Sequence, residues 1–434
     1  MTDSSGGREG SSRVLLAGLA ASNRERWIRA GSLDELAALA ATAGAEVVEK
    51  LVQVRNSVDP ALYFGSGFAD RLGAMCREAA VGLVVVDEPL TPTQQRNLEE
   101  AVGVRVIDRS ALILDIFAIH ARTAEARLQV ELAQLEYRQS RLVGMRDELS
   151  RLGGGIGTRG PGETRLEVDR RRIKQRITAL RRGLEKVDRE RAVQRRARSR
   201  LPRVALVGYT NAGKSTLFNR LTESRVLVSD RLFATLDANT RPWQLAEHLR
   251  VVLTDTVGFI RHLPHELVAS FRATLAEVRE ASLLLHLADV TDTKLDGTLD
   301  AVRDTLEQVG AGSVPVRLVF SKCDRLFDDA ARDRLDRLYP GSVFLSAQSG
   351  EGIEDLRQAL VGHFEAGMVA CRFSLPVGRQ DLVHHARVAG RVVREVQAGG
   401  RIRLTVLGFP EDIGRARGLL AGLPDVRVSA ARSG

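Results

Sequence analysis

The amino-acid sequence predicts an α/β protein in which a doubly wound, mostly parallel sheet is flanked by two smaller parts. An N-terminal α/β subdomain with a long antiparallel helical hairpin should precede this sheet, and a small α+β domain should follow it. The length of 434 residues exceeds one domain of roughly 100–200 residues. Strand-like and helix-like patterns alternate over residues 13–108 and again over 201–366, whereas one apolar stripe at helical spacing dominates the residues between them.

Residues 13–108 are expected to form the N-terminal α/β subdomain, after a polar segment, residues 1–12, that we expect to be disordered. The apolar runs RVLLAGL, AEVVEKLVQVR, GLVVVD and VRVID predict strands. The segment SLDELAALAATAG and residues 68–80 and 91–102 predict the helices between them.

Residues 109–200 are expected to form the helical hairpin. Leucines recur at steps of four, three and seven residues after Ala124, and a second stripe with the same spacing occupies residues 166–187. A glycine-rich loop, residues 153–162, separates the two stripes and cannot continue a helix. Two stripes of matching length predict that the arms pair antiparallel.

Residues 201–366 are expected to form the doubly wound domain. The runs PRVALVG, VVLTDTVG, ASLLLHLADV, VRLVFSKCD and SVFLSA predict strands, and helical patterns, such as residues 298–309, lie between them. Residues 367–434 then predict a strand, a helix over 379–398, a second strand and a helix over 411–421, which is a small α+β domain.

The formal charge of +9 is distributed unevenly. Residues 162–200 hold 15 Arg and Lys against 6 Asp and Glu, and the rest of the chain holds 49 of each. Basic charge concentrated on one arm predicts a polyanionic partner there, with the other domains near neutral. Because the chain has only 6 lysines against 58 arginines, as expected from a GC-rich genome, each lysine is more informative than each arginine.

Cysteine spacing and hydropathy exclude several classes of protein. Cys76, Cys323 and Cys371 form no CxxC pair, so neither a disulfide framework nor a zinc site is indicated. The N-terminus lacks the apolar segment of a signal peptide, and no window approaches the roughly 20 apolar residues of a membrane span. We therefore expect a cytoplasmic protein without a membrane span.

The segment GYTNAGKST, residues 208–216, fits the pattern G-x-x-x-x-G-K-[ST] between a predicted strand and a helix. The amides of such a loop converge on phosphates, Lys214 reaches the β and γ phosphates, and the Ser215 hydroxyl binds Mg²⁺. The alternative, a simple glycine turn, is disfavoured by the strand and the helix on either side.

Three further segments follow in the order that a GTPase requires. Asp255 and Gly258 form a DxxG pattern at the end of an apolar strand, where the Gly258 amide can meet a γ-phosphate. Asp324, in SKCD, can accept two hydrogen bonds from guanine, and Ala347, in SAQ, can present its amide to guanine O6. Thr235, in LFATLDANTR, is a candidate second Mg²⁺ ligand in a segment that orders with the γ-phosphate. Each segment alone could also be an ordinary polar strand end or turn without a function, but the four segments in series favour binding of a guanine nucleotide.

These residues together resemble the HflX family of GTPases from about residue 13 to about residue 423. The most specific segments are TPTQQRNLEEAVGVRVIDRSALILDIFAIHARTAEARLQVELAQLEY, SRLGGGIGTRGPGETRLEVDRRRI, and FATLD before DTVGF. The resemblance implies an N-terminal domain of an α/β subdomain and a hairpin, a GTPase domain and a C-terminal extension. It also implies binding to the large ribosomal subunit, splitting of stalled ribosomes, and a bound state that GTP favours.

The resemblance carries the nucleotide contacts onto five segments. They are Gly208, Tyr209, Thr210, Asn211, Ala212, Gly213, Lys214, Ser215 and Thr216; Phe233, Ala234, Thr235, Leu236 and Asp237; Asp255, Thr256, Val257 and Gly258; Ser321, Lys322, Cys323 and Asp324; and Ser346, Ala347 and Gln348. Lys214, Thr235 and Gly258 are the expected catalytic and switch residues, and Ser215 and Thr235 the expected Mg²⁺ ligands.

Three positions in this site have particular consequences. Phe259 follows DxxG where many GTPases have a glutamine that orients water, so intrinsic hydrolysis should be slow and should be stimulated by the ribosome. Asn211 resembles an asparagine that related GTPases use to hold K⁺. Ser321 departs from the usual asparagine of NKxD, and a single hydroxyl should tie the base loop to the phosphate loop less strongly.

The hairpin carries the candidate RNA contacts. The glycine loop could simply be a flexible turn between two helices. Its glycines would also let the backbone approach RNA closely, and the candidate contacts are Gly153, Gly154, Gly155, Arg159 and Gly160. The resemblance places this tip at ribosomal RNA. A solvated helix face is the alternative for the second arm. The successive Arg170, Arg171 and Arg172 favour phosphate contact without base readout.

The sequence thus predicts a Mg²⁺-dependent GTP hydrolase whose partners are GTP or GDP and the large ribosomal subunit with its rRNA. We expect no binding to DNA, and a monomer on the ribosome. Two alternatives stay open: a GTP-gated rRNA-binding assembly factor, and an ATP-dependent RNA-remodelling enzyme or helicase with a second nucleotide site. The segment YFGSG, residues 63–67, has no loop lysine to support the latter.

Overall fold

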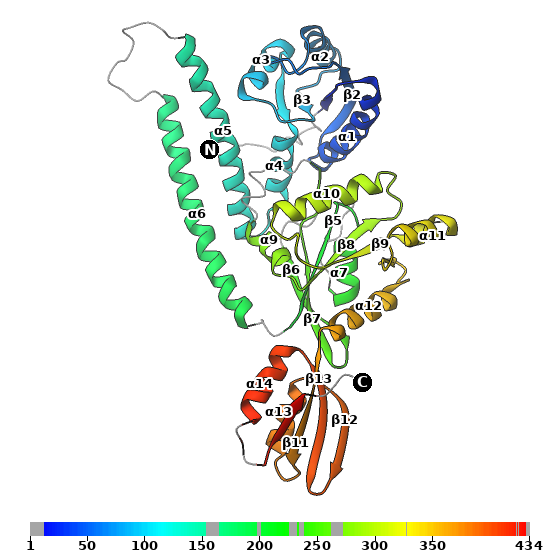
Figure 1. Cartoon of the computed structure of the whole chain (residues 1–434). Coiled ribbons are helices and arrows are strands. Elements are labelled where there is room, and N and C mark those ends of the chain that lie inside the picture. The colour runs from blue at the N-terminus through cyan, green and yellow to red at the C-terminus, as the bar shows by residue number, and fades with distance from the viewer. Residues whose placement is uncertain are drawn as a thin grey trace, which may run out of the picture.

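The computed structural model describes residues 13–152, 165–197, 201–224, 232–233, 238–261, 272–326, 328–421, 423 and 425–430. It contains a four-stranded, a six-stranded and a second four-stranded sheet in chain order. In Figure 1 the six-stranded sheet lies in the middle, with the N-terminal sheet above it, the hairpin beside it and the C-terminal sheet below. The predicted fold class is therefore confirmed.

The N-terminal subdomain is a parallel sheet of order β2-β1-β3-β4. Its elements are β1 (Arg13–Ala20), α1 (Asn23–Thr42), β2 (Glu46–Val54), α2 (Ser66–Glu78), β3 (Leu83–Val86), α3 (Pro92–Val102), β4 (Arg105–Asp108) and α4 (Arg109–His120). Local signals set the helix ends. Helix α3 begins with a capping box between Thr91 and Gln94 and ends at Gly103, whose φ of 80° suits glycine.

The hairpin consists of α5 (Ala124–Leu152) and α6 (Arg165–Ala197), which lie side by side in Figure 1. Leu132 on α5 and Ile177 and Leu180 on α6 form its buried contact, as the apolar stripe predicts. Ion pairs border this contact: Arg176 donates from Nε and Nη2 to the two carboxylate oxygens of Glu131, at 2.6 and 2.8 Å. The glycine-rich loop lies outside the described residues.

The central sheet has the order β10-β9-β8-β5-β7-β6. All neighbours are parallel except β6, which runs antiparallel to β7 at the edge. The elements are β5 (Arg203–Gly208), α7 (Lys214–Thr222), β6 (Asn239–Ala246), β7 (Leu249–Asp255), α9 (Arg272–Arg279), β8 (Leu283–Asp289), α10 (Leu295–Gln308), β9 (Val316–Ser321), the 3₁₀ helix η1 (Cys323–Arg325), α11 (Asp329–Leu338), β10 (Val343–Phe344) and α12 (Ile353–Ala366).

The C-terminal sheet is antiparallel, with the order β12-β13-β11-β14. Its elements are β11 (Val369–Pro376), α13 (Gln380–Val388), β12 (Arg391–Ala398), β13 (Arg401–Gly408), α14 (Pro410–Leu420) and β14 (Arg427–Ala430). The helix predicted over residues 379–398 is wrong in its second half, which is strand β12. β-Branched valines favour a strand there, and Gly399 and Gly400, both at positive φ, allow it to pair with β13.

A single apolar cluster crosses from the N-terminal subdomain into the central domain. It joins Phe117 of α4 to Phe233, Phe259 and Ile260, all of them buried. The rings of Phe117 and Phe233 meet edge to face with centroids 4.6 Å apart. The two domains therefore share part of one core. Within the described residues no helix is both long and apolar enough to cross a membrane.

Candidate nucleotide-binding site

The phosphate loop lies between the end of β5 and the start of α7, as the motif predicts. Gly208 has a φ of 150°, and a Cβ there would lie 2.3 Å from the carbonyl oxygen of Leu287, so only glycine fits. Gly213 caps α7 with a φ of 88°. The first amides of α7 are thereby left at the loop, where an anion can accept hydrogen bonds from them.

Lys214 is buried inside this loop. Its ammonium donates to the carbonyl oxygens of Gly208, at 3.0 Å, and Tyr209, at 2.7 Å. Burial lowers the pKa of Lys214 from 10.5 to about 8, and Asp255 partly opposes that shift. A phosphate at the loop would supply the negative charge that this ammonium needs in place of water.

The residues beside Lys214 suit a Mg²⁺ ion. Ser215 donates a hydrogen bond from Oγ to Oδ2 of Asp255 at 2.8 Å, and Asp255 is fully buried. Hydroxyl and carboxylate oxygens are hard ligands, and Mg²⁺ takes few protein ligands besides phosphates and water. Ser215, one of the two expected ligands, is therefore held beside a buried carboxylate. Thr235, the expected second ligand, lies outside the described residues.

The DxxG segment packs directly against the phosphate loop. The Thr256 hydroxyl donates to the carbonyl oxygen of Leu206 at 2.6 Å. Gly258 lies so close that a Cβ would be 2.9 Å from Thr210 and 3.1 Å from the Lys214 ammonium. Phe259 donates from its amide to Gly208 at 3.0 Å and accepts from the Thr210 amide at 2.8 Å. Gly258 is thus held against the phosphate loop, beside the Lys214 ammonium.

The base-recognition loop is tied to the phosphate loop in spite of the missing asparagine. The buried Ser321 hydroxyl lies 2.8 Å from the carbonyl oxygen of Ala212 and 3.1 Å from that of Ala288. A hydroxyl has one proton, so it donates to one of these at full strength. The tie expected to weaken is therefore retained as a single bond.

The neighbours of Ser321 are held in place by contacts with β8 and with Leu345. Lys322 has a φ of 58°, and its ammonium lies 2.7 Å from Oδ2 of Asp289 at the end of β8. Asp324 is exposed in η1. The buried Cys323 anchors this turn through its amide, which donates to the carbonyl oxygen of Leu345 at 3.2 Å.

The SAQ segment follows β10 beside this loop. Ser346 is fully buried and accepts a hydrogen bond at Oγ from the Ser349 amide at 3.1 Å, while Ala347 is half-buried and Gln348 exposed. Gly352 closes the turn with a φ of 71°. Only glycine fits there, because a Cβ would lie 1.9 Å from the carbonyl oxygen of Phe344. The segment is thus a hydrogen-bonded turn with Ala347 near its tip.

Of the predicted contact residues 233–237, the structure describes Phe233 alone. Ala234, Leu236 and Asp237, like Thr235, lie outside the described residues. Phe233 is described, and its side chain is buried against Phe117 in the core that the two domains share. Its ring therefore packs in this core.

The predicted RNA contacts are described only in part. Gly153, Gly154, Gly155, Arg159 and Gly160 lie outside the described residues. Near the start of α6, Arg171 and Arg172 are exposed and Arg170 is half-buried. Arg172 makes a single exposed contact to Asp169, at 4.0 Å, which is weak.

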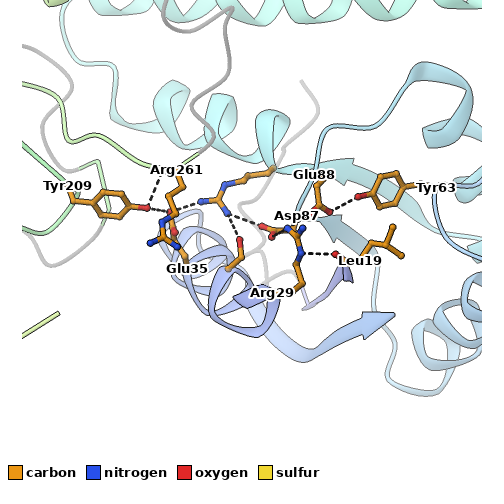
Figure 2. A network of polar contacts seen from close by, with 10 residues as sticks. Leu19, Arg29, Glu35, Tyr63, Asp87, Glu88, Tyr209 and Arg261 are labelled. Atoms are coloured by element: carbon orange, nitrogen blue, oxygen red, sulfur yellow. Dashed lines mark hydrogen bonds and ion pairs between the residues drawn. The ribbon is translucent and has the colours of Figure 1, made fainter. Parts of the chain in front are cut away.

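A buried polar network joins the phosphate loop to the N-terminal subdomain, and sequence reasoning missed it (Figure 2). The Tyr209 hydroxyl donates to Glu35 of α1 at 2.7 Å and accepts from the Arg261 amide at 3.0 Å. Arg109, only 1% exposed, binds the same oxygen of Glu35 at 2.5 Å and Oδ1 of Asp87 at 2.8 Å. One carboxylate therefore contacts both domains.

The network continues to the far side of β3. The second oxygen of Asp87 accepts from Arg29 at 3.0 Å. Arg29 also pairs with Glu88, which accepts from the Tyr63 hydroxyl at 2.7 Å. These residues lie at the carboxyl ends of β1 and β3, where open α/β sheets usually bind ligands. Here that edge holds protein side chains, and Tyr209 reaches it from the other domain. The polar residues that end GLVVVD and VRVID are the one sequence signal that could have pointed to this network.

A second carboxylate of this edge holds the hairpin. Asp108, at the end of β4, accepts from the Tyr137 hydroxyl at 2.8 Å and from Arg141 at 2.5 Å. It also caps α4 by accepting from the Ala111 amide at 2.9 Å. The hairpin and the central domain are thus attached at the same edge of the N-terminal sheet.

Comparison with known proteins gives matches along most of the chain. Family models described as "GTP-binding GTPase N-terminal", "GTP-binding GTPase Middle Region" and "50S ribosome-binding GTPase" match residues 30–118, 120–198 and 203–322. The chain is 45% identical over 366 residues to the GTPase HflX of Caldanaerobacter subterraneus, covering 84% of each protein. It is 47% identical over 347 residues to the GTPase HflX of Escherichia coli, covering 79% of this chain and 82% of that protein. A solved GTP-binding protein from Sulfolobus solfataricus in complex with GDP is 24% identical, with a TM-score of 0.40 over 80% of this chain and 97% of that one.

Replacing Ser321 by alanine should weaken nucleotide binding, because the carbonyl oxygen of Ala212 loses its donor. A buried hydrogen bond of about 1–2 kcal/mol corresponds to an affinity for GDP that is about 5- to 30-fold lower. Titration with fluorescently labelled GDP measures this. Ser349→Ala, in the exposed part of the SAQ turn, is the matched control. Unchanged affinity in Ser321→Ala would show that the tie is unimportant.

Replacing Arg109 by leucine should destabilise the protein, because the buried Asp87 would keep Arg29 as its one remaining counterion and the half-buried Glu35 would lose its guanidinium partner. Breaking one partner of a buried ion pair costs about 3–5 kcal/mol. The expected result is a lower midpoint of urea-induced unfolding, measured by circular dichroism. Arg105→Leu removes an exposed arginine four residues away and should change the midpoint little. Equal midpoints for both variants would contradict this role of Arg109.

His286 on β8 should make the protein less stable in acid. Burial, with Lys214 nearby, lowers the pKa of His286 from 6.5 to about 4. The unfolded chain therefore binds one more proton between these two pH values, so stability is complete above pH 6.5 and falls as the pH drops toward 4. At about 1.4 kcal/mol per pKa unit the loss reaches about 3 kcal/mol.

The variant His286→Leu should lose less stability than the unmodified chain over this range, measured by urea unfolding at several pH values. The exposed His384 provides the control variant, His384→Leu. The same pH dependence in the His286 variant and the unmodified chain would exclude this contribution.

Proposed function

The chain belongs to the HflX family of GTPases, and from this premise we propose that it binds the large ribosomal subunit and splits or rescues stalled ribosomes. The family membership expected from the sequence is confirmed, and with it a ribosome-associated enzyme that binds and hydrolyses GTP. The particular subunit, the splitting and the residue roles below are our proposals.

The observation that supports this proposal most directly is the attachment of the phosphate loop to the N-terminal domain. The hydroxyl of Tyr209, in the loop, accepts a hydrogen bond from the amide of Arg261, which lies two residues after Phe259. The same hydroxyl donates to Glu35 of the N-terminal domain. A change at the γ-phosphate that moves the DxxG segment would therefore also move a contact of the N-terminal domain. GTP binding and hydrolysis can thus select between two arrangements of the parts that face the ribosome.

We propose the following roles at the nucleotide. Lys214 and the loop amides bind the β and γ phosphates, the Gly258 amide contacts the γ-phosphate, and Asp324 and the Ala347 amide recognise guanine. Ser215 and Thr235 would hold Mg²⁺, which neutralises phosphate charge when bound. Asn211, exposed in the loop at a φ of 62°, would hold K⁺ if the enzyme uses it.

Phe259 explains why the intrinsic reaction should be slow. Its side chain is buried in the core shared by the two domains, and its backbone is paired with the phosphate loop. It therefore supplies no polar group to orient the attacking water. We propose that the ribosome supplies or rearranges the missing group.

The hairpin would contact the ribosomal RNA. We propose that the glycine loop, with Arg159 at its tip, approaches RNA closely and that Arg170, Arg171 and Arg172 contact phosphates. These residues support binding that depends on salt and not on base sequence. We further propose that the protein acts in the cytoplasm and is a monomer on the ribosome.

The test is multiple-turnover hydrolysis of GTP and ATP with and without large subunits, together with sedimentation of whole ribosomes. We expect the protein to hydrolyse GTP but not ATP, and large subunits to stimulate this hydrolysis strongly. With GTP present, whole ribosomes should be converted into subunits. Stimulation without any splitting would favour the assembly factor, and ATP hydrolysis would favour the RNA-remodelling enzyme.

The variant Asp324→Asn provides the specificity control for that experiment. It should lose GTP hydrolysis and gain activity with xanthosine triphosphate, because the amide matches the changed base edge. A variant that kept its preference for GTP would remove Asp324 from the proposed base contact.

A further inference from the structure

The C-terminal sheet has one covered and one open face. Helices α13 and α14 pack on the covered face through Phe373, Leu404 and Val406 among others. Side chains alternate along each strand, so the residues between these core positions point to the other face. None of the described elements outside the C-terminal sheet makes an extensive contact with that face.

Arginines and small hydroxyl residues alternate in two neighbouring rows across the open face. The pairing of the strands places Ser429, Arg372, Thr405 and Arg394 in one row, and Arg427, Ser374, Arg403 and Val396 in the next. Arginines of the two rows are therefore diagonal neighbours, about 7–8 Å apart at their backbones. We call the four residues Arg372, Arg394, Arg403 and Arg427 the arginine face.

The arginine face is free to bind a partner. All four side chains are exposed, and none has an ion pair or hydrogen bond to another described residue. The positions of the open face in the four strands, as far as they are described, include no Asp or Glu. The one acidic residue of β12, Glu395, points to the covered side and pairs with Arg387 of α13 at 2.9 Å. The positive charge of this face is thus uncompensated.

The charge of the whole C-terminal part agrees with this arrangement. Residues 367–434 contain 11 arginines against 5 Asp and Glu, an excess of 6. The expectation that all domains outside the hairpin are near neutral is therefore wrong. Outside the basic arm the chain holds 49 basic and 49 acidic residues. This balance arises because acidic segments elsewhere offset the positive charge of the C-terminal part.

We propose that the arginine face binds the phosphate backbone of folded RNA, as a second RNA contact far along the chain from the hairpin. This inference deepens the proposed function and rests on it for the identity of the RNA as ribosomal. Guanidinium groups bind phosphate oxygens through two hydrogen bonds, and the Ser and Thr hydroxyls between them are further phosphate donors.

The composition of the face favours RNA backbone over the other polyanions. The described positions include no aromatic side chain on which an unpaired base could stack, so single-stranded readout is disfavoured. An acidic protein partner would normally meet an apolar or aromatic centre, and here Val396 is the largest apolar side chain within the two rows. Phosphates of a duplex need only the charges and hydroxyls that are present.

The test is binding of the full chain to a labelled duplex RNA of about 16 base pairs, followed by fluorescence anisotropy at several salt concentrations. In the face variant all four arginines become glutamine: Arg372→Gln, Arg394→Gln, Arg403→Gln and Arg427→Gln. The control variant removes the same number of exposed arginines from the covered side and the domain edge: Arg379→Gln, Arg387→Gln, Arg415→Gln and Arg417→Gln. Both variants have the same net charge.

We expect the face variant to bind duplex RNA about tenfold or more weakly. The slope of log affinity against log salt should fall in magnitude by about three to four, since each of the four lost phosphate contacts removes close to one unit. The control variant should retain most of the affinity. Equal losses in the two variants, or no loss in the face variant, would overturn the proposal. So would loss of polyglutamate binding with duplex RNA binding intact, which would indicate an acidic protein partner.

A third variant, Arg170→Gln with Arg171→Gln and Arg172→Gln, separates this proposal from the proposed function. Splitting of ribosomes by the unmodified chain tests the proposed function independently of either surface. If the hairpin variant alone loses duplex RNA binding, the proposed function survives and the arginine face is excluded. If the face variant loses binding while the unmodified chain does not split ribosomes, the arginine face survives without that function.

Discussion

The buried guanidinium of Arg109 is the interaction on which the arrangement of the domains depends. It lies between Asp87, at the end of a strand in the N-terminal sheet, and Glu35, which also holds the phosphate-loop residue Tyr209. A buried charge is tolerated only when it is paired and hydrogen-bonded, so these partners must stay together. The carboxyl edge of the N-terminal sheet, where many α/β proteins hold a ligand, is therefore used to hold another domain.

The GTPase domain is consequently not an independent module. Phe233 and Phe259, from the two segments that we propose to respond to the γ-phosphate, are buried in a core that contains Phe117 of the N-terminal domain. The phosphate loop itself donates a hydrogen bond to that domain through Tyr209. Residues that commonly act only on the nucleotide thus also act as packing residues between domains. At Phe259, where many GTPases have a catalytic glutamine, the side chain packs in this shared core.

The charged surfaces follow a different logic from the nucleotide site. Cations at the hairpin contact are partly neutralised, since Arg176 and Arg181 bind glutamates of the opposite arm. The four arginines of the arginine face have no such partners among the described residues, although the C-terminal part has a smaller net positive charge than the hairpin arm. Unpaired cations bind phosphates more readily than paired ones, because no existing ion pair must first be broken. Pairing, and not the local count of arginines, therefore identifies the available surface.

The sequence by itself determined the features that depend on neighbouring residues. Apolar periodicity predicted the three parts and the hairpin, and the spacing of Gly208, Gly213, Lys214 and Ser215 predicted the phosphate loop. Local periodicity failed at residues 391–398, where helix and strand patterns are ambiguous until the pairing with β13 decides between them. The sequence predicted a weaker tie at Ser321, but the acceptor, the carbonyl oxygen of Ala212, depends on how two loops approach each other.

Only the tertiary structure decided how the parts communicate. Tyr209 and Glu35 are 174 residues apart in the chain, and no local pattern records their contact. The rows of the arginine face likewise combine residues from four strands, whose register sets which side chains become neighbours. Motifs are local because a bound phosphate contacts consecutive amides of one loop. The domain contacts and the charged surface are not local, because they form only when distant segments fold against one another.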